Sequence, residues 1–375
     1  MSLSNPYSRV MIDLAAIQKN YLSLRHRIGK ADCAVVLKAN AYGLGVEAVA
    51  PALYGVGCRH FFVAYKDEAV FLKQTLAEGT AKIYVLNGPY DSSDWPTFYH
   101  HNNLIPVLNT LKDLEDWHSY CRCVEKALPT ALHINTHMHR LGLPWSEYQS
   151  LDFSAYPYLN LRLVMSHLSC AEDGNHPANL KQLRQMRELQ RNHPKSLISL
   201  ANSGGIFLGS AYHFDMVRPG VALYGLGGDE GSLSPCLTLQ AQILQIQEIQ
   251  AKDPVGYGET FIAQKPMRLA CLAIGYGDGV PWRLAQNPEA HVWIDGQKAP
   301  IVGRVSMDLM TVDVTNVSNV KVGDWATLLN NTLTPEVWSG WSQMIHYEIL
   351  LNLGDRVQRV YTQTQSILTA ETALC

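Results

Sequence analysis

Eight short apolar segments recur through the first part of the chain, and stretches long enough to hold helices separate them. The segments have the length and the branched side chains of buried strands. A parallel strand that alternates with a helix eight times is the pattern of a (β/α)8 barrel. We therefore expect a TIM-type barrel over residues 1–234. The predicted strands span residues 34–37, 61–64, 83–86, 105–108, 131–134, 161–165, 197–200 and 216–217.

The pattern changes from about residue 235 onwards. Residues 237–249 and 269–274 look like strands, and residues 292–294 run into the Asp295-Gly296 turn, which is typical of a hairpin. The fold class that we predict is α/β, with an N-terminal barrel followed by a smaller, mainly β C-terminal domain at residues 235–375. The first ~10 residues could pack with this second domain.

The charges of the chain argue against two classes of partner. Lys and Arg total 30 against 33 Asp and Glu, so no basic field attracts nucleic acid and no polybasic run suits an anionic membrane. No apolar stretch approaches the ~18 residues of a membrane span, and the N-terminus lacks the build of a secretory signal. The eight cysteines are scattered, which favours reduced structural thiols. We expect a cytoplasmic protein whose partner is a small molecule.

Lys38 lies at the end of the first predicted strand, directly before a turn that contains Tyr42, Gly43 and Gly45. An amine at the mouth of a strand can be desolvated, which lowers its pKa and lets it form a Schiff base or move protons. The alternative is a lysine that merely ends a strand in solvent. The tyrosine and the glycines, which let backbone approach a ligand closely, favour the chemical interpretation.

Two further turns follow the seventh and eighth predicted strands. Asn202-Ser203-Gly204-Gly205 comes after the seventh, and Arg218-Pro219-Gly220-Val221 comes after the eighth. Barrels commonly bind phosphate with backbone N–H groups at these two strand ends. Each turn alone is more typical of structure than of function, but the pair together with Lys38 favours a phosphorylated cofactor. Catalytic groups of such barrels lie at the carboxyl ends of strands, where Lys38, His167 and Arg218 fall.

Three histidines, His133, His137 and His139, precede Arg140 in one segment. No acidic residue interleaves them, and alternate histidines along a strand-to-loop segment are more often surface residues than metal ligands. We therefore expect no metal site. Arg140 is the better functional candidate, since a guanidinium fork suits a substrate carboxylate.

Two tyrosines of the second predicted domain, Tyr257 and Tyr276, are framed by glycines. A turn tyrosine packed by its ring is the structural alternative. A catalytic role would require a lowered pKa, on which the sequence is silent.

Several stretches of the chain resemble motifs of the alanine racemase family, in that family's order and spacing. The stretch Val36-Leu37-Lys38-Ala39-Asn40-Ala41-Tyr42-Gly43 closely resembles its pyridoxal-phosphate lysine motif. The resemblance covers nearly the whole chain and both predicted domains. The other matching stretches span residues 138–142, 202–203, 217–225, 255–258, 274–279 and 302–308.

The resemblance implies an enzyme that uses pyridoxal 5′-phosphate to interconvert L-alanine and D-alanine, supplying D-alanine for peptidoglycan. Lys38 would carry the cofactor as a Schiff base and would serve as the base for the D-enantiomer. Tyr257 would be the base for the L-enantiomer. It would reach into the active site of the other subunit, as would Tyr276 and Met307. A head-to-tail homodimer follows, and its monomer should be inactive.

The remaining roles are also implied by the resemblance. Arg218 would bond the pyridine nitrogen, supported by His167 beside the ring. Because an arginine keeps its proton, the cofactor would be a weaker electron sink and would leak little into transamination. The expected phosphate ligands are Tyr42, Ser203 and the backbone N–H groups of Gly220 and Val221, and the expected ligands of the substrate carboxylate are Arg140 and the backbone of Met307.

Two positions depart from the family pattern. Many members have a lysine, often carbamylated, where this chain has His133, and that group orients the carboxylate-binding arginine. A histidine cannot supply the same anion, so a chloride or another acid could do so, and we expect weaker orientation of Arg140. Many members have a tyrosine where this chain has Asp355. An aspartate cannot donate to phosphate, which leaves substrate preference and access open.

Three alternatives stand beside alanine racemisation. One is a racemase with a broader or shifted preference, such as serine. A barrel-type pyridoxal-phosphate decarboxylase is disfavoured, because such enzymes typically use an acid where this chain has Arg218. A non-catalytic cofactor-binding protein built from a lone barrel is disfavoured by the second domain with Tyr257 and Met307.

Overall fold

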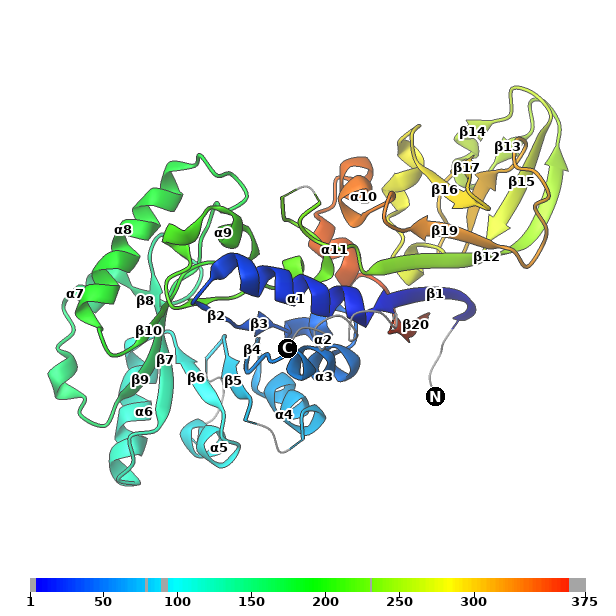
Figure 1. Cartoon of the computed structure of the whole chain (residues 1–375). Coiled ribbons are helices and arrows are strands. Elements are labelled where there is room, and N and C mark those ends of the chain that lie inside the picture. Colours follow the sequence, from blue (N-terminus) through cyan, green and yellow to red (C-terminus); the bar gives the residue numbers. More distant parts are fainter. Residues whose placement is uncertain (1–4, 78–79, 89–93, 230, 364–375) are drawn as a thin grey trace, which may run out of the picture. The chain divides into compact units, whose positions relative to one another are not determined.

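The computed structural model describes residues 5–77, 80–88, 94–229 and 231–363 (Figure 1). They group into two compact units. The barrel unit contains the described residues of Ile17–Ala41 and Val46–Ser234. The β unit contains those of Met1–Ala16, Tyr42–Gly45 and Pro235–Cys375. The short segment Tyr42–Gly45 thus interrupts the barrel unit in the sequence.

Parallel strands form the core of the barrel unit. Most of their residues are buried, and every residue of the strands His60–Val63 and Ile105–Leu108 is buried, as expected for a sheet covered on both faces. The strand order is β2-β11-β10-β9-β7-β6-β5-β4-β3, and the short β8 (Leu143–Pro144) pairs with β7. The strands are β2 (Asp32–Cys33), β3 (Val35–Val36), β4 (His60–Val63), β5 (Lys82–Val85), β6 (Ile105–Leu108), β7 (Pro129–Asn135), β9 (Asn160–Met165), β10 (Leu197–Ser199) and β11 (Met216–Val217).

Residues 32–36 close this sheet into a barrel. β2 pairs with β11 on one side, and β3 pairs with β4 on the other. The N–H of Ala34 donates to Val217 O at 2.9 Å and the N–H of Val36 donates to Pro219 O at 2.9 Å. The two short strands are therefore halves of one strand that has a neighbour on each side. The predicted (β/α)8 barrel is confirmed.

Helices connect the strands and surround the sheet (Figure 1). Several begin at side-chain caps. Thr110, for example, accepts from the N–H of Asp113 at 3.1 Å, and the Asp113 carboxylate accepts from the N–H of Thr110. The helices are α1 (Leu14–Ile28), α2 (Lys38–Tyr42), α3 (Val46–Gly55), α4 (Lys66–Thr75), α5 (Trp95–His101), α6 (Leu111–Cys123), α7 (Trp145–Gln149), α8 (Pro177–Asn192) and α9 (Ser203–Phe207), with short 3-10 turns at η1 (Phe153–Ala155), η2 (Ser210–Tyr212) and η3 (Val221–Tyr224).

The β unit is built around its longest strand, β12 (Leu237–Ile249), which pairs with the strands at residues 5–13, 267–272 and 325–329. Leu237, Leu239, Ala241 and Ile243 are buried at alternate positions, so one face of this strand packs into the core. The predicted mainly β second domain is confirmed. Its other strands are β1 (Asn5–Asp13), β13 (Pro254–Val255), β14 (Phe261–Ile262), β15 (Met267–Leu272), β16 (His291–Ile294), β17 (Gln297–Pro300), β18 (Met310–Asp313), β19 (Trp325–Leu329) and β20 (Val357–Thr362).

Short helical elements fill the remainder of the β unit. Two are α-helices, α10 (Pro335–Ser342) and α11 (His346–Leu351). The 3-10 turns η4 (Tyr257–Glu259) and η5 (Tyr276–Asp278) contain two of the predicted site residues, and η6 (Trp282–Gln286) follows them.

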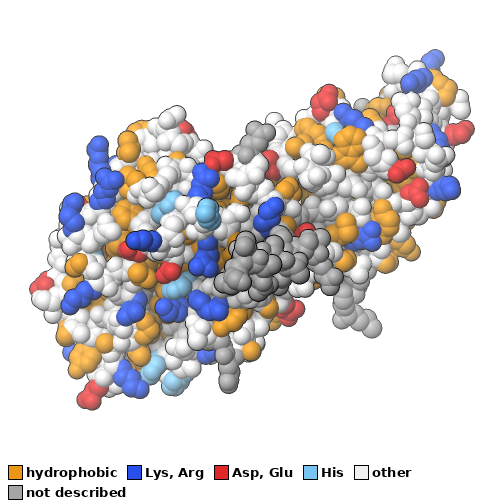
Figure 2. All heavy atoms as spheres, in the orientation of Figure 1, with side chains coloured by type: hydrophobic (Ala, Val, Ile, Leu, Met, Phe, Trp, Pro, Cys, Tyr) orange, Lys and Arg blue, Asp and Glu red, His pale blue; other side chains and the backbone are white. Residues whose placement is uncertain are grey.

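The described residues include no helix long and apolar enough to cross a membrane. Figure 2 shows Lys, Arg and His side chains gathered over the middle of the barrel unit on the visible face, where Asp and Glu are few. A local concentration of positive charge favours small anionic ligands.

Asn20 of α1 makes a buried polar contact that should stabilise the barrel unit. Its Nδ2 donates to Leu223 O at 3.0 Å and to Ser234 O at 2.8 Å, and its Oδ1 accepts from the N–H of Ser234 at 2.7 Å. The Asn20→Ala substitution leaves these backbone groups without partners and is expected to destabilise the protein by about 2–3 kcal/mol. Thermal unfolding of this variant should begin at a clearly lower temperature than that of Asn175→Ala, an exposed control. Equal midpoints would contradict the assignment.

Candidate active site

Five basic side chains lie at the carboxyl-terminal ends of the barrel strands. Lys38 follows β3, His133 lies in β7, Arg140 follows β7, His167 follows β9 and Arg218 follows β11. The charges of both arginines lower the pKa of both histidines, and the charge of Lys38 also lowers the pKa of His167. The three strand-end residues that the sequence predicted, Lys38, His167 and Arg218, are therefore brought into one electrostatic cluster.

Arg218 is the anchor of this cluster, with only 3% of its surface exposed. Its guanidinium donates through Nη1 to Ser199 Oγ and through Nη2 to Ser166 O. Ser199 Oγ in turn donates to Met216 O at 2.7 Å. Burial lowers the pKa of Arg218 to about 9, which leaves the side chain charged at neutral pH.

His167 lies against Arg218, with 3.5 Å between Nδ1 and Nη2. Since an arginine can only donate, Nδ1 is the acceptor of this contact. Burial, and then the charges of Arg218 and Arg140, lower the pKa of His167 well below its usual range. His167 is therefore a neutral imidazole that carries its proton on Nε2.

The amine of Lys38 is desolvated, as the sequence predicted. Burial lowers its pKa, the nearby charge of Arg140 lowers it further, and Glu68 raises it. A larger fraction of this amine is neutral near pH 8 than for an exposed lysine. The site thus provides the nucleophilic form of an amine next to fixed positive charges.

The backbone after Lys38 is left-handed over four consecutive non-glycine residues. Ala39, Asn40, Ala41 and Tyr42 have φ angles of 53°, 54°, 55° and 57°. Each such residue costs roughly 1–2 kcal/mol, and only asparagine tolerates the conformation well. The sequence predicted a turn that relied on Gly43 and Gly45, and it gave no sign of this strained turn before them.

Glu68, the third residue of α4, holds the start of the left-handed turn. Its Oε1 accepts from the N–H of Ala39 at 2.6 Å. Its Oε2 accepts from the N–H groups of Ala64 at 2.7 Å and Tyr65 at 3.3 Å, as a capping residue does. One carboxylate therefore ties the residue after Lys38 to the beginning of α4. Sequence reasoning missed Glu68, because its acidic position in a first helical turn indicates only a cap.

Three of the predicted phosphate ligands, Ser203, Gly220 and Val221, lie in the turns that follow β10 and β11. Ser203 Oγ accepts from the N–H groups of Gly220 at 2.9 Å and Ala222 at 3.2 Å. Both lone pairs of the hydroxyl are thus used, and its own proton remains to be donated. Val221 is the first residue of the turn η3, where a backbone N–H has no partner within the turn. The Gly220 N–H, by contrast, already serves Ser203.

The histidines that precede Arg140 have different hydrogen-bond partners. Asn135 Nδ2 lies 3.3 Å from His139 Nδ1, and Lys181 Nζ lies 3.3 Å from His137 Nδ1. Within the described part of the chain, no group of three or more His, Cys, Asp or Glu residues is arranged to hold a metal ion.

Three predicted residues, Tyr257, Tyr276 and Met307, belong to the β unit. Their exposed fractions are 71%, 47% and 55%, which is unusual for large side chains with apolar surface. Tyr257 follows Gly256, whose φ is 75° and whose Cβ, if added, would lie 3.2 Å from the N–H nitrogen of Arg304. The loop is therefore held closely while the Tyr257 side chain extends outward. A tyrosine packed by its ring into its own turn does not describe this geometry.

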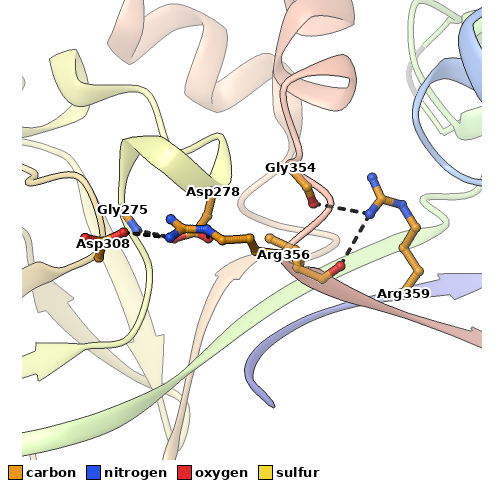
Figure 3. A network of polar contacts seen from close by, with 7 residues as sticks. Gly275, Asp278, Asp308, Gly354, Arg356 and Arg359 are labelled. Atoms are coloured by element: carbon orange, nitrogen blue, oxygen red, sulfur yellow. Dashed lines mark hydrogen bonds and ion pairs between the residues drawn. The ribbon is translucent and has the colours of Figure 1, made fainter. Parts of the chain in front are cut away.

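A network around Arg356 joins the loops that carry Tyr276 and Met307 (Figure 3). Arg356 pairs with the buried Asp278 at 3.0 Å and with Asp308 at 2.8 Å. The N–H of Tyr276 donates to Ser306 O at 3.0 Å, and the N–H of Gly277 donates to Met307 O at 2.8 Å. Because the Met307 carbonyl is occupied and cannot donate, only its N–H could bind a carboxylate.

The predicted site residues therefore fall into two groups. The barrel unit holds the larger group, and the β unit holds Tyr257, Tyr276 and Met307. Tyr42 ends the left-handed turn and groups with the β unit. The larger group comprises Lys38, Arg140, His167, Ser203, Arg218, Gly220 and Val221.

Comparison with known proteins identifies the family. The family model of the alanine racemase N-terminal domain matches residues 12–227, and that of the alanine racemase C-terminal domain matches residues 236–361. The chain belongs to the alanine racemase family. It is 38% identical to the alanine racemase of Brucella canis over 96% of this chain and 95% of that protein. It is 39% identical to that of Rickettsia peacockii over 94% of this chain and 98% of that protein.

Solved structures of alanine racemases share the fold. The alanine racemase of Bartonella henselae, which was crystallised with covalently bound pyridoxal phosphate, matches with a TM-score of 0.89 and 39% identity. The match covers 96% of this chain and 100% of the Bartonella henselae chain. The biosynthetic alanine racemase of Pseudomonas aeruginosa matches with a TM-score of 0.86 and 29% identity, over 95% of this chain and 99% of that one. The resemblance noted in the sequence is thus confirmed for both domains.

Replacing Glu68 by glutamine tests how this alanine racemase family member holds its lysine. The substitution removes the negative charge that raises the pKa of Lys38, so the pH midpoint for reductive methylation of Lys38 is expected to fall. It also replaces one acceptor oxygen, so amide hydrogen exchange over residues 39–42 should become about tenfold faster. Both are read by mass spectrometry of the cofactor-free protein. Glu47→Gln, at an exposed position in α3, is the control, and identical behaviour of the two variants would contradict the role of Glu68.

Proposed function

We propose that this protein is a pyridoxal 5′-phosphate-dependent racemase that interconverts L-alanine and D-alanine. The observation that carries the proposal is the desolvated amine of Lys38, which lies among Arg140, His167 and Arg218 at the mouth of the barrel. The cofactor, when bound, would supply a conjugated ring that stabilises negative charge at the substrate α-carbon. The covalently bound pyridoxal phosphate of the Bartonella henselae relative supports this choice.

The donors of the barrel unit fit such a cofactor. Ser203 has a hydroxyl proton to give and Val221 has a backbone N–H to give, and both would bind phosphate oxygens. We also assign Tyr42 to the phosphate, and the Gly220 N–H acts by holding Ser203 in place. The hydrogen bonds of Arg218 to described residues all come from its two Nη groups, which leaves its Nε–H available. This N–H would donate to the ring nitrogen.

Arg218 determines the charge of that ring nitrogen. Its pKa of about 9 keeps the guanidinium protonated, so it donates a hydrogen bond without transferring a proton. His167, neutral and accepting from Arg218, adds no competing charge. The ring would therefore withdraw less charge than one with an aspartate partner, which favours prompt return of the α-proton.

Arg140 is the residue that we assign to the substrate carboxylate. Arg140 is an exposed residue that follows β7, and its charge acts on Lys38. A fork of parallel N–H donors binds a carboxylate with two hydrogen bonds. The N–H of Met307 would be a further donor.

Racemisation requires a base on each face of the α-carbon. We assign Lys38 to the D-enantiomer and Tyr257 to the L-enantiomer. Tyr257 is 71% exposed and belongs to the other compact unit, and Tyr276 and Met307 are exposed in the same unit. These exposures are what a residue needs in order to enter the active site of a second subunit. We therefore propose a head-to-tail homodimer that makes D-alanine for peptidoglycan in the cytoplasm.

The Lys38→Ala variant tests the cofactor attachment. Wild-type protein incubated with pyridoxal phosphate should show a near-visible absorbance band that borohydride abolishes, with the added mass on the peptide that contains Lys38. Lys38→Ala should show neither, and its racemase activity should fall on the order of a thousandfold or more. Lys112→Ala, at a side chain that is 79% exposed, is the control. A band and a labelled peptide that survive in Lys38→Ala would overturn the assignment. A panel of amino-acid substrates identifies a shifted preference.

The Tyr257→Phe variant tests the second base and its subunit. In deuterated water, loss of the α-hydrogen from L-alanine should slow by about 100-fold or more, while loss from D-alanine should slow much less. Tyr65→Phe, at an exposed tyrosine of the barrel unit, should change neither. Equal slowing from both enantiomers would contradict the two-base assignment.

Mixing inactive subunits tests the dimer. A heterodimer of Lys38→Ala and Tyr257→Phe subunits has one intact site only if each site takes its tyrosine from the partner. Random exchange should then restore about a quarter of the wild-type activity. No recovery, with heterodimers demonstrated by mass, would show that both residues act within one subunit.

A further inference from the structure

Asn109, the residue after β6, fixes the orientation of its own side-chain amide. It is 3% exposed, and its Nδ2 donates to Leu86 O at 3.1 Å and to Val107 O at 2.9 Å. A flipped amide would direct its oxygen at both carbonyls, which is unfavourable. The Oδ1 atom must therefore be the one that faces His133, at 2.8 Å from Nδ1.

This contact determines the tautomer of His133. Since Oδ1 of an amide can only accept, His133 Nδ1 carries a proton and donates it. In a neutral ring the other nitrogen, Nε2, then has a free lone pair. Burial, and then the charges of Arg218 and Arg140, lower the pKa of His133 to about 3. The imidazole is therefore neutral at physiological pH and presents an acceptor at Nε2.

The two charged groups that act on His133 are guanidinium groups, which can only donate hydrogen bonds. The charges of Arg140 and Arg218 act on it, and it acts on the neutral His167. Arg218 already donates to Ser199 and Ser166. Arg140 is exposed, and within the part of the chain that the structure describes no hydrogen bond holds its guanidinium. Arg140, unlike Arg218, therefore has guanidinium N–H groups that are available to donate to His133.

The chain geometry keeps His133 and Arg140 close. The segment after β7 turns back, and Ile134 pairs with Leu143 of β8. Gly142 has a φ of 102°, and a Cβ there would lie 3.1 Å from His133 Cγ and 3.1 Å from His133 Cδ2. The ring is therefore clamped between Asn109 on its Nδ1 side and the backbone of Gly142, two residues from Arg140, on its Cδ2 side.

We propose that His133 is a positioning residue for Arg140: Asn109 holds the ring as the Nδ1–H tautomer, and the Nε2 lone pair accepts a hydrogen bond from the Arg140 guanidinium. The proposal rests on the proposed function in that Arg140 is assigned to the substrate carboxylate. It replaces the expectation that a chloride or another acid is needed beside Arg140. A fixed neutral acceptor orients an arginine without neutralising the charge that attracts a carboxylate.

The tautomer can be measured without any turnover. Protein loaded with pyridoxal phosphate and labelled with ¹⁵N-histidine is studied by long-range ¹H–¹⁵N correlation, and the His133→Gln spectrum identifies the His133 signals by their loss. The expected result is a neutral ring with the proton on Nδ1 throughout pH 6 to 8. A proton on Nε2, or a positively charged ring in this range, would overturn the proposal. This readout stands even if the protein racemises another amino acid.

Steady-state kinetics test the link to Arg140. In His133→Phe, which has no acceptor, KM for alanine should rise about tenfold with kcat changed less than about threefold. His133→Gln, whose amide oxygen can replace Nε2 as an acceptor, should recover most of the loss. His101→Gln, at an exposed histidine of α5, is the matched control.

Three outcomes would overturn the proposal. One is a fall in kcat alone, and another is a glutamine variant no better than phenylalanine. The third is a wild-type KM that rises when chloride is replaced by gluconate, which would assign the orienting role to a bound anion. Retention of the cofactor absorbance in both variants separates misplacement of Arg140 from loss of the fold. If no variant or wild type racemises any amino acid, the proposed function fails, and the tautomer measurement alone decides the role of Asn109.

Discussion

The pairing of residues 32–36 with a strand on each side is the constraint on which the active site depends. These residues bond β11 through Ala34 and Val36 and bond β4 through β3. Closing the sheet in this way places the first strand beside the last. Lys38 and Arg218, which are far apart in the sequence, therefore lie at neighbouring strand ends. Without closure, the lysine and the turns that we propose to bind phosphate would have no common site.

Closure also accounts for the electrostatics of the site. A buried Arg218, an exposed Arg140 and an amine crowd the same strand ends, and the histidines between them respond by becoming neutral. Neutral imidazoles serve as hydrogen-bond acceptors for guanidinium groups, and they do not add positive charge. Glu68 offsets part of the positive charge near Lys38 and at the same time anchors a strained left-handed turn. Strain at such a position persists only where surrounding contacts hold it.

The β unit has a different kind of constraint, because its predicted site residues extend outward. The ion pairs of Arg356 with Asp278 and Asp308 hold two loops together and leave Tyr276 and Met307 at the surface. Large exposed side chains on rigid loops suit binding to another surface. This is the physical basis for assigning Tyr257, on its own glycine-framed loop, to the active site of a second subunit.

The sequence by itself determined the fold class and the family, and it predicted which residues form the site. Periodic apolar segments predicted the barrel, because buried parallel strands must be short and apolar, and a lysine, an arginine and glycine turns at their ends predicted the site. Only the tertiary structure decided how these groups act. The fold holds the turn after Lys38 in a left-handed conformation. It also brings the Glu68 carboxylate to the N–H of Ala39 and the Asn109 amide to His133, although these residues are distant in the sequence. A sequence pattern reports which faces are apolar, but the direction of a hydrogen bond, and hence the tautomer of a histidine, depends on which atoms the fold brings into contact.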